Sequence, residues 1–142
     1  MRIDETGHHI VARQFISTGS EWERLAGYSR AVVDGNEVFV SGTVGFDRAT
    51  GAFPEGAAAQ AEKAIDIIAW ALKEAGAEVL DIVRVRVFIP DPADVPAVSE
   101  VVARRLGSAR ATNTTICSPL AVAEAKVEIE VTARKRRAGN AC

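Results

Sequence analysis

Two glutamates near the carboxyl end of the chain have the spacing of a pair that could do acid–base chemistry. Glu128 and Glu130 alternate with Val127, Ile129 and Val131. In a strand, both carboxylates then point to one face and the apolar side chains to the other. A carboxylate in a partly desolvated cleft has a raised pKa and can relay a proton or orient a water molecule. On an open strand face the same residues are only solvated charges, and the spacing alone favours this plainer interpretation.

Other chemical signals in the sequence are weak. Ser41-Gly42-Thr43 ends an apolar run with small residues, which fits a close approach of the backbone to a ligand and equally fits a β-bulge. His8 and His9 are adjacent, with no acidic or cysteine cluster beside them, so we expect no metal site. The sequence has no GxGxxG, P-loop, GxSxG, HExxH or CxxC motif. We therefore expect no cofactor.

Composition excludes several classes of protein. The 142 residues suit one soluble domain, with 48% hydrophobic and 25% charged residues. Seventeen basic against 19 acidic residues leave a net charge of -2, so no basic field would gather nucleic acid. No apolar run approaches the ~20 residues of a membrane helix, and residues 1–10 are too polar for a signal peptide, so we expect a cytoplasmic protein that does not bind membranes. Cys117 and Cys142 are far apart and predict free thiols.

Alternation and helical spacing predict the elements that position these residues. We expect a hairpin of strands 30–33 and 37–44 around Asp34-Gly35-Asn36, a helix over 57–75, a strand over 82–89, a helix over 93–106, and strands over 112–117 and 126–134. Strand 37–44 is apolar on both faces, which predicts a central strand covered on both sides. The order β-β-α-β-α-β-β predicts an α+β two-layer sandwich, with both helices on one face of a mixed sheet.

The same pattern divides the chain into three parts. Residues 27–134 form the predicted domain. Residues 1–26 form an N-terminal arm that has room for a short strand within 10–16, and residues 135–142 form a flexible basic tail. The tail carries few charges and no interleaved aromatic residues, so a solvated tail is favoured over a nucleic-acid contact.

Six short segments, taken in order, resemble the RidA/YjgF family. They are Gly27-Tyr28-Ser29-Arg30-Ala31, Val38-Phe39-Val40-Ser41-Gly42, Gln60-Ala61, Glu74-Ala75-Gly76-Ala77, Asp81-Ile82-Val83-Arg84-Val85 and Lys126-Val127-Glu128-Ile129-Glu130-Val131. The resemblance covers residues 27–134. It implies a chorismate-mutase-like fold, a homotrimer with small-molecule clefts between subunits, and hydrolysis of reactive enamines and imines to a keto acid and ammonia without a cofactor.

The resemblance also implies roles for individual residues. Tyr28, Ser41 and Gly42 would line the cleft, and Glu128 would hold the attacking water. An imine carbon is already electrophilic, so such a site needs mainly positioning and proton transfer.

One position departs from the family pattern. In the deaminase branch an arginine opens the penultimate strand, thirteen positions before the lysine of the final strand, and forms a bidentate salt bridge with the substrate carboxylate. Counting back from Lys126 gives Asn113, which has no charge and no guanidinium fork. Arg110 matches this position only if the following loop is three residues longer. We therefore assign substrate recognition to Asn113, with Thr115 on the same strand.

These observations predict a divergent member of the family with a small-molecule ligand. The first hypothesis is a hydrolase of enamines, imines or related metabolites other than the standard 2-imino acids. The second is a trimer that binds or senses a metabolite without catalysis, because the missing arginine removes a substrate anchor. A third, ribonuclease-like activity, is disfavoured by the acidic charge and by the lack of a His/Lys cluster in the predicted cleft.

Overall fold

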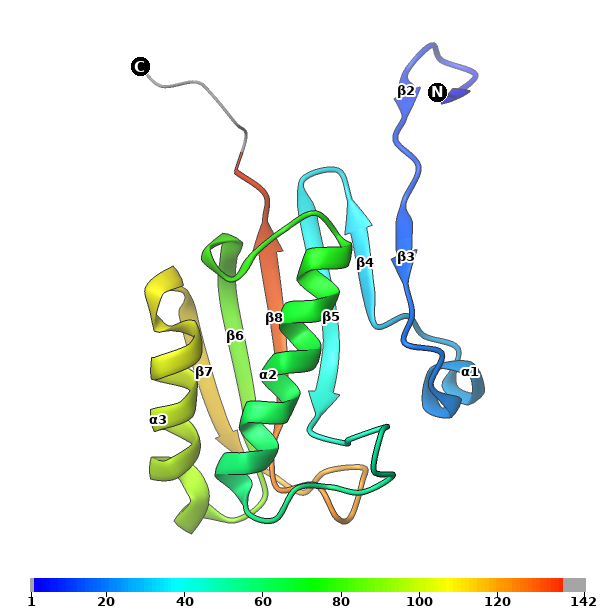
Figure 1. Ribbon diagram of the computed structural model, residues 1–142. Coiled ribbons are helices and arrows are strands. Elements are labelled where there is room, and N and C mark those ends of the chain that lie inside the picture. Colours follow the sequence, from blue (N-terminus) through cyan, green and yellow to red (C-terminus); the bar gives the residue numbers. More distant parts are fainter. Residues whose placement is uncertain (1, 137–142) are drawn as a thin grey trace.

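A six-stranded mixed sheet forms the centre of the computed structural model, which describes residues 2–136 (Figure 1). In spatial order its strands are β3 (Gln14–Ile16), β4 (Ala31–Asp34), β5 (Glu37–Val44), β8 (Glu128–Arg134), β6 (Ile82–Ile89) and β7 (Thr112–Cys117). Only β6 and β7 pair in parallel, and the other neighbours are antiparallel. The predicted mixed sheet is thus confirmed, and β8 lies at its centre.

The hairpin between β4 and β5 turns at the predicted position. Gly35 has a φ of 60°, a left-handed conformation that a residue without Cβ adopts at little cost. The turn sets the register Val33↔Val38, which places the alternate valines of both strands on the buried face.

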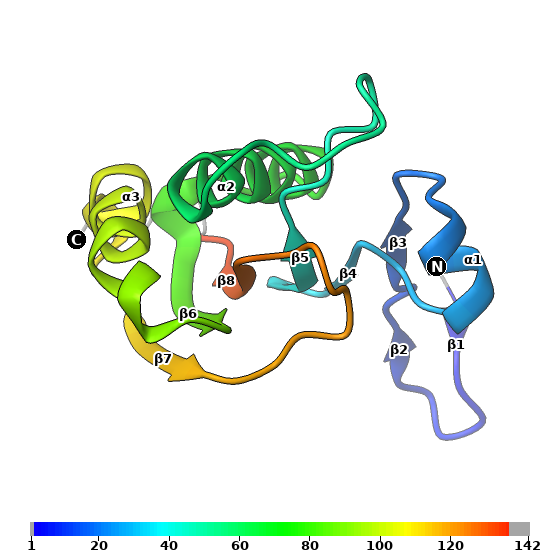
Figure 2. The same ribbon diagram turned by 90° about the horizontal axis from the view of Figure 1, so that it is seen from below.

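Both long helices pack on the same side of the sheet, as predicted. They are α2 (Ala57–Glu74) and α3 (Val95–Leu106), and Figure 2 shows them together above the strands. The stripe of α2 that faces the sheet contains fully buried Ala61, Ile65, Ile68 and Leu72. Three short 3₁₀ helices, η1 (Val79–Asp81), η2 (Pro92–Asp94) and η3 (Gly107–Ala109), join these elements. Within residues 2–136, no helix is long and apolar enough to cross a membrane.

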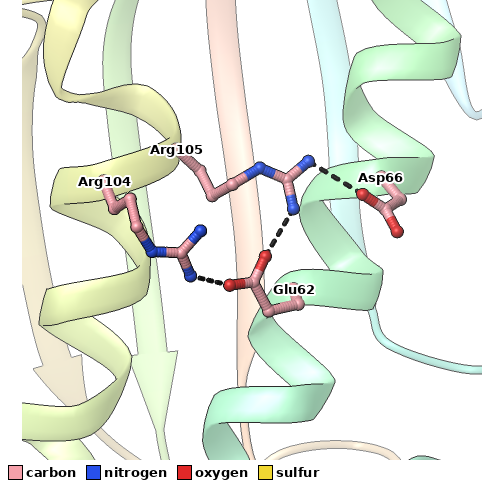
Figure 3. Close-up of polar contacts among 4 residues, drawn as sticks. All are labelled: Glu62, Asp66, Arg104 and Arg105. Carbon is pink, nitrogen blue, oxygen red and sulfur yellow. Dashed lines mark hydrogen bonds and ion pairs between the residues drawn. The ribbon is translucent and has the colours of Figure 1, made fainter.

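An ion-pair network ties α3 to α2 (Figure 3). The Glu62 carboxylate accepts hydrogen bonds from both Arg104 and Arg105, and Arg105 also donates to Asp66 at 2.8 Å. Because one arginine bridges two acids from successive turns of α2, the network fixes how α3 lies along its neighbour.

The N-terminal arm contains a helix that the sequence analysis did not predict. The arm begins with a two-stranded sheet of β1 (Arg2–Ile3) and β2 (His9–Ile10). Strand β3 comes next and pairs with β4, and the helix α1 (Glu21–Ala26) lies between these two strands in the chain. The Ser20 hydroxyl caps α1, and the buried Glu23 carboxylate accepts bonds from Ser17, Thr18 and Ser20. A serine three residues before a glutamate is a helix-start signal, so the sequence did carry a clue to α1.

Strand β5 is central, but within one chain only one of its faces is covered. Val38 is fully buried, whereas Phe39 on the opposite face is 41% exposed. Val83 and Ile116 are other large apolar side chains exposed on the sheet. Cys117 is a free, exposed thiol, as predicted, while Cys142 and residues 137–142 of the predicted tail lie outside the described residues.

Candidate functional site

A β-bulge in β5 positions the small residues of the candidate site. The pairing of β5 with β8 runs regularly up to Val40↔Val131 and resumes at Thr43↔Ile129, so Ser41 and Gly42 fall in the irregularity between them. Hydrogen bonds to the start of β4 hold the bulge: the Ser41 amide donates to the Arg30 carbonyl at 2.9 Å, and its hydroxyl donates to the Ser29 carbonyl at 2.6 Å. The proton of the Ser41 hydroxyl is therefore used in a hydrogen bond within the protein.

Glu128 lies directly against this bulge. It opens β8 opposite Val44, and its side chain occupies the space beside Gly42 where another residue would place its Cβ. Burial of the carboxyl raises the pKa of Glu128; the positive charge of Arg30 lowers it in part, and the negative charge of Glu130 raises it. The result is a half-buried carboxyl group that binds its proton more tightly than an exposed glutamate does.

The two glutamates of β8 are thus distinguished by their surroundings. Both lie on the face opposite the buried Val127 and Ile129, as the alternation predicted. Glu130, however, forms an ion pair of 3.2 Å with the half-exposed Arg86 of β6. Glu128 instead lies half-buried beside Gly42, and it is the glutamate to which the family resemblance assigned a role.

Arg30 is a further residue of this site, and from the sequence it was expected only as part of the segment Gly27-Tyr28-Ser29-Arg30-Ala31. It is 7% exposed, and its Nη1 donates to the Thr43 hydroxyl at 3.3 Å. Its Nε and Nη2 atoms are buried and have no hydrogen-bond partner. Its Cζ lies 5.5 Å from the ring centroid of Tyr28, within the range of a cation–π contact. The sequence signal for Arg30 was its place directly before the apolar run Ala31-Val32-Val33, next to a buried strand. Its burial stands out because arginine is seldom buried without a partner.

We call Tyr28, Arg30, Ser41, Gly42 and Glu128 the Glu128 site. The structure brings these five residues together around the bulge, although they come from two strands and from the segment that precedes β4. Tyr28 is 39% exposed and lies at the solvent side of the group. The site combines a half-buried carboxyl group, a buried guanidinium and an accessible phenol.

Asn113 and Thr115 lie elsewhere in the same chain. They pair with Val85 and Val87, whose side chains are buried under the helices, whereas Glu128 pairs with Phe88 of the opposite alternation. Residues directly opposite each other in a sheet share a face. Asn113 and Thr115 are therefore on the helix side of β7, and a single chain does not bring them to the Glu128 site.

These two residues instead line a cavity of about 300 Å³ between β7 and α3, which we call the α3 cavity. The Thr115 hydroxyl donates to the Asn113 side-chain oxygen at 2.9 Å. Ser99 and Arg110 also line the cavity, with Val98, Val102 and Leu106 as its apolar wall. Arg110 has a φ of 52°, which is uncommon for a residue with a Cβ. The residues that line the cavity include polar side chains but no carboxylate that could act as a base.

No described residues group as a metal site would require. Among residues 2–136, no three His, Cys, Asp or Glu side chains lie close enough together to hold an ion. His8 instead contacts the Thr6 hydroxyl through Nδ1 at 2.7 Å, at the tip of the arm.

Comparisons with known proteins agree with this architecture. Residues 18–135 match the family model described as Endoribonuclease L-PSP. The chain is 32% identical to a RutC family protein of Leuconostoc mesenteroides subsp. cremoris over 130 residues, covering 88% of this chain and all of that one. It is 32% identical to the 2-iminobutanoate/2-iminopropanoate deaminase of Rattus norvegicus over 92 residues, covering 64% of this chain and 67% of that protein.

A solved structure shows the same fold. It is a member of the YjgF/YER057c/UK114 family from Mycobacterium tuberculosis, with a TM-score of 0.80 and 36% identity, and the match covers 87% of this chain and 100% of that chain. The YjgF gene product of E. coli matches with a TM-score of 0.76 and 27% identity over 87% of this chain and 99% of that chain.

Proposed function

The chain belongs to the RidA/YjgF family, and from that premise we propose that it hydrolyses reactive enamines or imines of small metabolites at the Glu128 site. The reaction needs one water: it adds across the C=N bond to give a carbinolamine, which then loses ammonia and leaves a carbonyl compound. Rat and plant relatives carry deaminase names, which supports the reaction class. The observation that carries the proposal is the half-buried Glu128 carboxyl packed against Gly42, with its raised pKa.

Glu128 would move the proton in both steps. In the first step its carboxylate takes a proton from the attacking water and delivers it to the imine nitrogen. In the second step it takes the proton of the carbinolamine hydroxyl and delivers it to the same nitrogen as the C–N bond breaks and ammonia leaves. A carboxyl group with a raised pKa suits this exchange better than a fully solvated one, because its proton affinity is closer to that of the groups it serves. The positive charge of Arg30 opposes the rise in the pKa of Glu128 and so favours the ionised form that accepts a proton.

We also propose that the working protein is a homotrimer and that its clefts lie between subunits. The open face of the sheet leaves Phe39 41% and Ile116 44% exposed, and association would cover such a face. Within one chain Asn113 and the Glu128 site are on opposite faces. A cleft that contained both would therefore take Asn113 from a neighbouring subunit, where it would contact the ligand without adding charge.

A scan of imines tests the proposed function. Imines made in solution by oxidation of different amino acids would be supplied to the protein, and release of ammonia would be compared with the rate without protein. We expect acceleration for at least one imine or enamine and only weak acceleration for 2-iminobutanoate. If no compound is hydrolysed but small oxo acids still bind, the protein is instead a metabolite-binding member of the family.

A further inference from the structure

The least satisfied polar group of the described chain is the guanidinium of Arg30. It is buried to more than nine-tenths, yet Nε and Nη2 have no hydrogen-bond partner. Its one hydrogen bond, from Nη1 to Thr43, is long at 3.3 Å. A buried cation without an acceptor is costly to the fold, so such a group calls for a physical explanation.

The two free nitrogens form one particular edge of the guanidinium. In arginine the N–H bond of Nε and one N–H bond of Nη2 are parallel and lie in one plane. This edge is the fork that matches the two oxygens of a carboxylate. Because Nη1 is held by Thr43 and the ring of Tyr28 lies over Cζ at 5.5 Å, the orientation of the free edge is fixed by the fold.

No carboxylate of the protein occupies this edge. Glu128 is near enough for the charge of Arg30 to lower its pKa, but the described residues include no ion pair between the two. A residue whose only task was to neutralise Glu128 would be expected to contact it directly.

We propose that Arg30 binds the carboxylate of a small organic acid, an oxo or imino acid, through its Nε–Nη2 edge. This proposal deepens the proposed function and rests on it for the location of the ligand. It places the anionic end of the ligand on the Glu128 side of the cleft, not at Asn113. An imine carbon drawn toward Arg30 takes a different position from one anchored at residue 113, so binding of carboxylates and slow turnover of simple 2-imino acids are compatible.

The edge is not open to solvent in the free chain. Both nitrogens are buried, and the ring of Tyr28, a residue that is 39% exposed, lies 5.5 Å from the guanidinium Cζ. A carboxylate reaches the edge only after side chains around Arg30 move. Binding is therefore coupled to a local rearrangement around Arg30.

A direct test uses the unaltered protein. With arginine ¹⁵N-labelled at Nε, NMR would follow the Arg30 Nε–H signal, assigned by its loss in Arg30→Lys, during titration with 2-oxobutanoate. The matched ligand is 2-oxobutanamide, which has the same length and no charge. We expect a saturable downfield shift with the acid and none with the amide. A signal that stays in place while the acid binds, or that moves equally with the amide, would overturn the proposal.

Variants give a second measurement that does not depend on catalysis. Arg30→Gln should weaken binding of 2-oxobutanoate roughly 10- to 100-fold, and Arg30→Lys should weaken it less, because it keeps the charge but loses the fork. Arg13→Gln, at an exposed arginine paired with Asp34, is the control and should bind as the wild type does. Equal affinity in Arg30→Gln and wild type would contradict the proposal. If the wild type hydrolyses no imine but still binds 2-oxobutanoate in a way that depends on Arg30, only the proposed function is contradicted.

Discussion

Gly42 provides the space that the Glu128 carboxyl occupies. A Cβ at position 42 would lie under 3.0 Å from Glu128 Oε1 and 3.1 Å from Cδ, closer than real Cβ atoms approach such neighbours. The obstructing atoms are the end of a flexible side chain, so the carboxyl can move while the backbone stays. We predict that Gly42→Ala lowers imine hydrolysis by about 10-fold or more while changing the free energy of unfolding by less than about 1 kcal/mol. Turnover and chemical denaturation of the same sample would measure both.

Gly45 supplies the matched control for that substitution. A Cβ there would collide with the backbone carbonyl of Gln60 in α2, which cannot move aside as a side chain can. Gly45→Ala should therefore lower the free energy of unfolding by about 1–3 kcal/mol. If Gly42→Ala proves as destabilising as Gly45→Ala, or leaves turnover unchanged, the Glu128 carboxyl does not depend on Gly42 for its place.

The raised pKa of Glu128 predicts a pH-dependent change in stability. A carboxyl whose pKa is higher in the folded than in the unfolded state binds more protons when folded. Its contribution to stability therefore falls as pH rises from the unfolded pKa through the folded pKa. Glutamine resembles the protonated form. Glu128→Gln should therefore unfold at higher denaturant concentration than wild type near pH 7, and the difference should vanish below the pKa of an unfolded glutamate. A variant less stable than wild type at pH 7 would show that the ionised carboxylate is stabilised by the fold.

Because asparagine stands at position 113 in place of the arginine of the deaminase branch, we predict slow turnover of the standard 2-imino acids. Loss of a bidentate charged contact typically costs about 2–5 kcal/mol, so kcat/KM for 2-iminobutanoate should lie far below that of arginine-bearing relatives. Asn113→Arg should raise it by about 10-fold or more. Fast hydrolysis of 2-iminobutanoate by the unaltered protein would refute the role given to position 113.

The oligomeric state tests whether the cleft lies between subunits. Light scattering at micromolar concentration should give three times the chain mass of 15.1 kDa. Phe39→Glu would place a charge on the open face of the sheet and should reduce both association and turnover, because half of the proposed cleft would be lost. A fully active monomer would exclude an interfacial cleft.

Much of this fold follows from patterns that local physics imposes. The Asp34-Gly35-Asn36 turn, the apolar stripe of α2 and the alternation around Ile129 each correspond to one element of the structure. Helix α1 was missed because its signal, a capping serine before Glu23, lies in a segment without helical periodicity of apolar residues. The short length of α1 leaves too few turns for a periodicity to show.

The site was harder to predict because it depends on contacts between distant segments. Alternation placed Glu128 and Glu130 on one face but could not tell that Arg86 would pair with Glu130 and that Gly42 would make room for Glu128. Arg30 contacts the ring of Tyr28, and its carbonyl accepts a hydrogen bond from the Ser41 amide in the bulge; a strand pattern reveals neither contact. Asn113 was assigned by its spacing from Lys126, and spacing does not show that β7 turns this residue toward α3.

The most direct measurement is the pH profile of imine hydrolysis in wild type and Glu128→Gln, with the best imine from the scan. If Glu128 is the base, wild-type turnover should rise with pH through its raised pKa, because only the ionised form accepts a proton from water. Glu128→Gln should lose about 10²–10⁴-fold in turnover and lack that rise. Turnover that is equal in the two proteins, with the same dependence on pH, would contradict the assignment of the chemistry to Glu128.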